Sequence, residues 1–130
     1  MGITKREDLV HPDLSYKIVG AAFTVFNELG EGHLEKIYQR AFALEFKRLG
    51  LNYKEQIYCP VVFNKEVIGK NYFDFLVEDQ VIVELKRNAY FSKKHMDQIT
   101  NYLRVSDLRL GLLIGFSTEG VRFKRIVNVR

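Results

Sequence analysis

The sequence has a single cysteine, two prolines and no long apolar run. Cys59 has no partner within the chain, which excludes an intrachain disulfide and a zinc site built from cysteines. We expect it to be a packed strand residue rather than a nucleophile, because free cysteine is usually buried. The longest apolar runs, such as GLLIGF at 111–116, are far too short to cross a bilayer. Residues 1–15 lack an apolar signal core, so the sequence predicts a cytoplasmic protein with no membrane association.

Linkers, repeats and a strong charge imbalance are also missing. No stretch rich in proline, glycine or serine divides the 130 residues, and no internal repeat occurs, which favours one domain. We expect a flexible N-terminal arm over 1–13 and this single domain over 14–130. The formal net charge of +4 permits a polyanionic partner without requiring one. The basic clusters at 85–95 and 122–125 also fit an ordinary solvated surface.

Apolar periodicity predicts the element order ααβββαββ. The expected helices cover residues 14–29, 33–49 and 92–105. The expected strands cover residues 53–63, 66–77, 81–86, 108–116 and 121–129. The fourth strand is apolar almost throughout, as in strands buried on both faces, and its position after the third helix indicates a parallel crossover. The sequence therefore predicts an α/β fold with a central mixed β-sheet flanked by helices.

The stretch YFDFLVEDQVIVELK at 72–86 has charged residues inside two apolar strands. With a turn at 78–80, the two strands pair so that one face is wholly apolar and Asp74 lies opposite Glu84. The predicted pairs are Val77 with Val81, Leu76 with Ile82, Phe75 with Val83, Asp74 with Glu84, Phe73 with Leu85, and Tyr72 with Lys86.

Two carboxylates in opposite positions have Cβ atoms roughly 4.5–5.5 Å apart, so they repel each other. A divalent cation bridging Asp74 and Glu84 would offset this repulsion, because hard cations such as Mg²⁺ take oxygen ligands. Lys86 projects on the same face as Glu84, within reach of a water or phosphate oxygen beside the metal. The alternative is a solvated hairpin face with a Glu84–Lys86 pair, and the residues alone leave both interpretations open.

Polar residues on two predicted helices could face the Asp74–Glu84 pair. Glu35 lies in the first turn of the second helix, where it either complements the helix dipole or adds a third carboxylate. Tyr38 lies one turn further on the same side. On the third helix, His95, Gln98 and Tyr102 recur at steps of three and four residues. They form either the half-exposed flank of an amphipathic helix or a set of donors facing a pocket.

Together, these motifs resemble the GxxExxY proteins of the PD-(D/E)xK nuclease superfamily, on its RecB-like side. GHLEKIY at 32–38 is similar to the GxxExxY signature, and QITNY at 98–102 resembles the Q-x-x-x-Y helix motif. YFDFLV followed by VELK resembles the D…(D/E)xK core. The likeness covers nearly all of residues 14–128. In one departure, the residue before Asp74 is phenylalanine rather than proline, as in many superfamily members.

The resemblance implies a restriction-endonuclease-like core and a role for each matching residue. Asp74 and Glu84 would be the metal-binding acids, with the Leu85 carbonyl as an additional ligand. Lys86 would stabilise the attacking water or the phosphate, and Glu35 would be the helix acid of the site. The residues expected to shape the pocket or contact substrate are Tyr38, His95, Gln98 and Tyr102.

We therefore predict a metal-dependent nuclease that hydrolyses phosphodiester bonds with Mg²⁺, or with Mn²⁺ in its place. On the resemblance alone, DNA is the expected substrate rather than RNA, and a homodimer is compatible with cutting both strands. A second hypothesis is a nucleic-acid-binding or assembly module that keeps the nuclease fold with little or no catalysis. A third is a structural α/β domain without a polyanionic partner, which would not bind Mg²⁺.

Overall fold

A computed structural model of the protein describes residues 10–88 and 90–128. The helices are α2 (Pro12–Leu29), α3 (Glu35–Arg48) and α4 (Lys93–Ser106). The strands are β1 (Tyr53–Phe63), β2 (Glu66–Val77), β3 (Val81–Lys86), β4 (Leu110–Ser117) and β5 (Gly120–Val127). The predicted order ααβββαββ is confirmed. Within the described residues, every helix is too short or too polar to cross a membrane.

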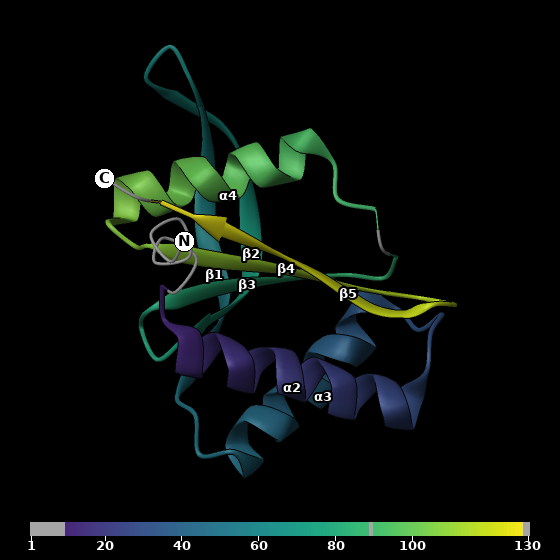
Figure 1. Ribbon diagram of the computed structural model, residues 1–130. Coiled ribbons are helices and arrows are strands. Elements are labelled where there is room, and N and C mark those ends of the chain that lie inside the picture. The colour runs from purple at the N-terminus through teal and green to yellow at the C-terminus, as the bar shows by residue number, and fades with distance from the viewer. Residues whose placement is uncertain (1–9, 89, 129–130) are drawn as a thin grey trace, which may run out of the picture.

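The five strands form one mixed sheet in the order β1-β2-β3-β4-β5, with α2 and α3 on one face and α4 on the other (Figure 1). β3 and β4 are parallel, whereas the other neighbours are antiparallel. The chain passes from β3 through α4 to β4, so the predicted parallel crossover is confirmed. This connection brings α4 over the sheet next to the end of β3.

Two hydrophobic cores lie on the two faces of the sheet, and the alternation of side chains in β4 supplies both. Leu112 and Ile114 pack in the core beneath α2 and α3, whereas Leu113 packs in the core beneath α4. Gly111 allows the close approach of α4, because a Cβ atom there would lie 2.6 Å from Cγ2 of Ile99. The prediction that this strand is buried on both faces is therefore confirmed.

Order extends into the segment predicted to be a flexible arm. Val10 is 5% exposed and packs in the core beneath α2. The helix α2 begins at Pro12, whose fixed φ suits the first helical turn. Residues 1–9 lie outside the described residues.

The β2–β3 hairpin has the predicted register near its turn, where the pairs are Val77–Val81, Leu76–Ile82 and Phe75–Val83. The ladder ends there, so the three predicted backbone pairs beyond Phe75 do not form. On the other side of β2, Gln56 of β1 has a left-handed φ of 54° and interrupts the β1–β2 pairing opposite Asp74. At Asp74, β2 therefore loses its pairing with β3, whereas its pairing with β1 is interrupted for one residue and resumes at Phe73.

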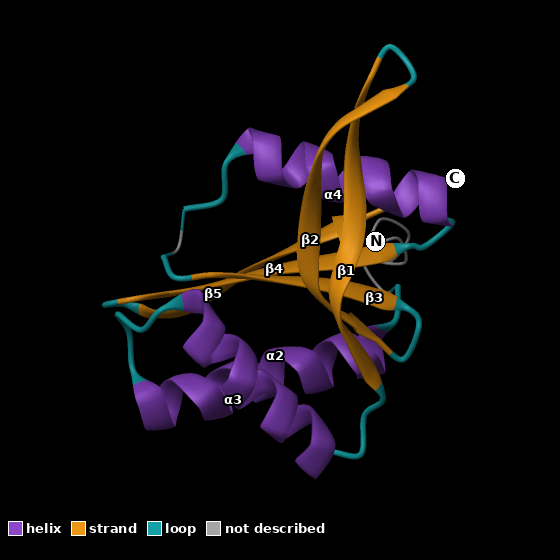
Figure 2. Ribbon diagram, turned by 180° about the vertical axis from the view of Figure 1, so that it is seen from behind, coloured by secondary structure: helices purple, strands orange, loops and turns teal. Residues whose placement is uncertain are grey.

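This interruption also corrects the prediction of one wholly apolar hairpin face. Phe75 packs beneath α2 and α3, but Phe73 packs in the core beneath α4, although the two residues are only two positions apart. Residues two apart share a face in a regular strand, so β2 changes its orientation at Asp74. Beyond this point the β1–β2 hairpin continues past α4 and projects from the body of the molecule (Figure 2).

Candidate active site

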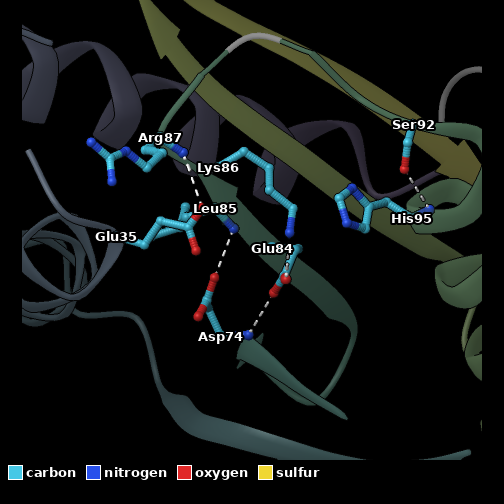
Figure 3. A network of polar contacts seen from close by, with 8 residues as sticks. All are labelled: Glu35, Asp74, Glu84, Leu85, Lys86, Arg87, Ser92 and His95. Atoms are coloured by element: carbon cyan, nitrogen blue, oxygen red, sulfur yellow. Dashed lines mark hydrogen bonds and ion pairs between the residues drawn. The ribbon is translucent and has the colours of Figure 1, made fainter. Parts of the chain in front are cut away.

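Asp74 and Glu84 meet where β2 separates from β3. The Asp74 backbone N–H donates to Glu84 Oε1 at 3.1 Å, and the Leu85 backbone N–H donates to Asp74 Oδ2 at 2.8 Å (Figure 3). Each carboxylate therefore takes a hydrogen bond that a backbone carbonyl would accept in a continuous ladder. Because of this exchange, the two acids face each other across the opening between the strands.

Burial makes both carboxylates hard to ionise. Desolvation and, after it, the charge of Asp74 raise the pKa of Glu84 to about 8, although the charge of Lys86 opposes the shift. Desolvation also raises the pKa of Asp74, against the lowering effect of the Leu85 N–H. The pair therefore retains a proton at neutral pH unless additional positive charge stabilises the ionised forms.

Lys86 supplies one positive charge at this place. Its Nζ lies 3.4 Å from Glu84 Oε2, and the Lys86 and Glu84 side chains are only 16% and 17% exposed. The chain after Lys86 turns back over β4, where Gly115 pairs with Lys86. A Cβ atom on Gly115 would collide with the Asn88 carbonyl oxygen, so this turn requires glycine.

Glu35 approaches the acids from the other side, as the first residue of α3. Its Oε2 accepts a hydrogen bond of 3.2 Å from the Arg87 backbone N–H, which follows Lys86 directly. The charge of Glu35 also contributes to the raised pKa of Asp74. Glu35 thus lies close enough to the carboxylate pair to influence it, and it holds the end of β3 to α3.

His95 reaches the site from α4, where Ser92 caps the helix by accepting from the His95 backbone N–H. Figure 3 shows its ring beside Lys86. Burial lowers the pKa of His95, and the charge of Lys86 lowers it further. These two effects favour the neutral imidazole, although the charge of Glu35 opposes them. Among the described residues its buried Nδ1 has no hydrogen-bond partner.

Tyr38 has a structural role, which corrects the prediction that it contacts substrate. The side chain is fully buried, its hydroxyl donates to the Gly30 carbonyl at 2.6 Å, and its ring stacks on Phe116 at 4.3 Å. It joins the loop before α3 to the sheet. A side chain with these contacts has no surface left for a ligand.

The remaining two predicted residues on α4 are Tyr102 and Gln98, and their contacts within the described residues do not include Asp74 or Glu84. Tyr102 is half-buried and packs edge-on against Phe73, with ring centroids 5.2 Å apart. Gln98 lines a groove between α4 and the β1–β2 hairpin together with Asn71 and Asn101. Neither asparagine was predicted as a site residue, although Asn71 is only three residues before Asp74 in a largely apolar strand. The Arg87 N–H was not predicted either, because side-chain patterns carry no signal for a backbone donor.

The donor groups fit a divalent cation held by two protein carboxylates. Within the described residues, no three His, Cys, Asp or Glu side chains gather closely enough to hold an ion. Mg²⁺ commonly takes one or two carboxylates and completes its shell with water and substrate phosphate oxygens. Asp74 and Glu84 match this pattern, and a cation between them would favour their ionised forms despite their burial.

Two of three comparisons with known proteins find a similarity. Residues 12–126 match the family model of the PD-(D/E)XK nuclease superfamily. The chain is similar to the crystal structure of SSO0001, with a TM-score of 0.53 at 13% identity, over 74% of this chain and 50% of that one. At this identity the similarity shows the fold alone, and the chain spans half the length of SSO0001. A search of curated proteins finds no significant match. Because the family match extends from the start of α2 almost to the end of β5, the chain belongs to the PD-(D/E)XK nuclease superfamily.

Proposed function

We propose that the protein is a metal-dependent nuclease whose site is formed by Asp74, Glu84 and Lys86, with Glu35 as the helix acid. Superfamily membership supports phosphodiester hydrolysis with a divalent metal ion. The observation that carries the assignment to these residues is the pair of acids facing each other where β2 leaves β3. We further propose Mg²⁺ as the ion, with Mn²⁺ as a substitute, and DNA rather than RNA as the substrate.

In this proposal Asp74 and Glu84 hold the cation, and the Leu85 carbonyl is an additional ligand. When bound, the cation supplies Lewis acidity and lowers the pKa of a water molecule. Lys86 places its ammonium where negative charge gathers on the phosphate during hydrolysis. Glu35 keeps Lys86 in place by holding the next backbone N–H. His95 presents a neutral nitrogen beside Lys86.

Metal binding tests the proposal independently of cleavage. We expect millimolar Mg²⁺ or Mn²⁺ to raise the melting temperature of the wild type, because a ligand that binds only the native state stabilises it. Asp74→Asn should lose this shift. The matched control is Asp79→Asn, which changes an exposed carboxylate that pairs with Lys54 at 3.1 Å; this variant should keep the shift.

Cleavage of labelled DNA and RNA in the same buffers separates the nuclease from the binding module. A metal-dependent thermal shift with cleavage of either substrate supports the nuclease. The same shift with no cleavage of any substrate would favour the module that keeps the fold without catalysis. If the wild type shows no thermal shift up to millimolar metal, the assignment of Asp74 and Glu84 as metal ligands is wrong.

A further inference from the structure

The groove between α4 and the β1–β2 hairpin has no role in the chemistry above. Its volume is about 530 Å³, within the range of roughly 300–1,000 Å³ of small-ligand sites. The hairpin side is apolar, with Cys59, Val61 and Val62. A groove of this size accepts a single flat ring with its attachments, but the cross-section of a nucleic-acid duplex cannot enter it.

The polar side chains of the groove match the edge of a nucleobase. Three amides line it, from Asn71 on the hairpin and from Gln98 and Asn101 on α4. Amide groups both donate and accept hydrogen bonds, which is why Asn and Gln pair with base edges. The Asn101 Oδ1 accepts from Arg104 at 3.3 Å, which leaves its NH₂ group as the donor for a ligand. The apolar hairpin wall supplies a surface for the face of the base.

The charge of the groove suits a phosphate. Lys93 and Lys94 line it, and its one acidic residue, Asp97, pairs with Lys93 at 2.8 Å. One net positive charge therefore remains on the helix side of the groove. Lysine side chains supply most of the sequence-independent attraction to a phosphate backbone.

The groove also lies beside the proposed site. Asn71 is three residues from Asp74 along β2, roughly 10 Å in an extended strand. Gln98 is one turn of α4 beyond His95, which faces Lys86. Neighbouring nucleotides of one strand can therefore occupy the groove and the acid pair together.

We propose that this groove binds an unpaired nucleotide next to the scissile phosphate, so that the substrate is a single strand or an unpaired end. The inference rests on the proposed nuclease function. It adds a substrate class, because a fully paired nucleotide cannot enter the groove.

Cys59 offers a direct test, since it is the only cysteine in the chain and lines the groove. The probe is a labelled single-stranded oligonucleotide, with a blunt duplex of the same sequence for comparison. The experiment uses the Lys86→Ala variant in the presence of Mg²⁺, so that the probe is bound without being cleaved. Fluorescence anisotropy gives the Kd, and the alkylation rate of Cys59 by N-ethylmaleimide reports occupancy. The buffer is mildly alkaline, because burial raises the pKa of this thiol. At a strand concentration ten times the Kd we expect alkylation about ten-fold slower, since only about one molecule in eleven is free. The duplex should leave the rate unchanged.

A blocking variant gives a second readout. Asn101→Trp fills the groove from an exposed position on α4 and should weaken single-strand binding about ten-fold, as expected for the loss of one base contact. The matched control, Val105→Trp, adds the same ring to a residue of α4 that is 78% exposed and does not line the groove; its binding should equal that of the parent.

The outcomes separate this inference from the proposed function. Cleavage with no protection of Cys59 by a bound strand, or equal cleavage of blunt duplex and single strand, overturns the groove assignment and leaves the nuclease in place. Unchanged binding by Asn101→Trp overturns it as well. If neither strand nor duplex binds and neither is cleaved, both proposals fall.

Discussion

At the scale of single residues, the site depends on two carboxylates whose ionised forms are disfavoured by the surrounding protein. Glu84 and Asp74 are held by two backbone N–H groups and one ammonium, yet burial dominates their pKa values. The sequence indicated a repulsive pair whose repulsion a cation would offset. The structure adds that desolvation is a larger obstacle to ionisation than charge repulsion for both groups.

The metal-free protein should therefore lose stability as the pH rises. The pKa of Glu84 is about 8 in the folded state, whereas that of an ordinary glutamate is 4.5, so the native state holds more protons between these values. Its contribution to stability is complete below pH 4.5 and is lost as the pH passes through 8. At about 1.4 kcal/mol per pKa unit, the loss amounts to at most about 5 kcal/mol. Urea unfolding in EDTA across this range measures it.

Glu84→Gln is the matched variant for this titration, because glutamine keeps an oxygen to accept from the Asp74 N–H but cannot ionise. We expect a flatter dependence of the unfolding free energy on pH than in the wild type. A wild-type stability that stays constant or increases over the same range would contradict the raised pKa.

Lys86→Ala should reduce cleavage by at least about 100-fold, the scale of losing one group that stabilises transition-state charge. Metal binding should persist, because Asp74 and Glu84 remain. Single-turnover cleavage and the Mg²⁺-dependent thermal shift report the two effects separately. Arg48→Ala, which removes an exposed cation paired with Glu45, serves as the control. Cleavage by Lys86→Ala at the wild-type rate would remove Lys86 from the chemistry.

Tyr38→Phe distinguishes the structural role of Tyr38 from the predicted substrate contact. The variant loses the hydrogen bond to the Gly30 carbonyl, and the unfolding free energy should fall by about 1–3 kcal/mol. Cleavage under conditions where the variant is fully folded should match the wild type. An increase in KM with unchanged stability would instead support the predicted contact between Tyr38 and substrate.

At the scale of elements, the site lies where three neighbouring segments interrupt regular structure. β1 has a left-handed residue at Gln56, whose Nε2 donates to Gln39 of α3 at 2.9 Å. β2 changes orientation at Asp74, and the chain after β3 turns back over Gly115 of β4. Apart from a register shift between Val61 and Val62 of β1, the sheet is regular on either side of these points. The geometry of the acids therefore depends on the interruptions.

Gly115→Ala tests one of these interruptions, the turn of the chain after Lys86. The added methyl group collides with the Asn88 carbonyl oxygen, so the segment after Lys86 must move, and overpacking of this kind costs about 1–3 kcal/mol. We expect cleavage to decrease in protein that is still folded. Gly20→Ala in α2 is the control, because a Cβ atom there has no neighbour within 4 Å. Equal cleavage rates for both variants would show that the position of this segment is unimportant.

At the scale of the whole molecule, the sequence predicted the architecture better than the site. Three strands were predicted with their observed bounds, at 53–63, 66–77 and 81–86, because turn residues separate their apolar runs. The register near the turn followed from the same alternation. The separation at Asp74 could not be predicted, because it depends on Gln39 of α3 holding Gln56 and on Phe73 finding space beneath α4.

The residues of the site were predicted to differing degrees for related reasons. Asp74, Glu84 and Lys86 come together because they share one hairpin, so local pairing rules place them. The position of Glu35 at the site could not be predicted from local pairing, because it depends on a contact between segments more than fifty residues apart in the chain. Tyr38 has the right spacing from Glu35 but faces the core. The sequence could not predict this, because periodicity shows which residues share a side of a helix but not which neighbouring element covers that side.

The acids of this site also replace two rungs of the sheet. Asp74 and Glu84 accept backbone N–H groups that would otherwise be left without a partner at the separation of β2 and β3. A homologue without these acids would thus have to close the opening between the two strands, or else provide other acceptors for the two N–H groups.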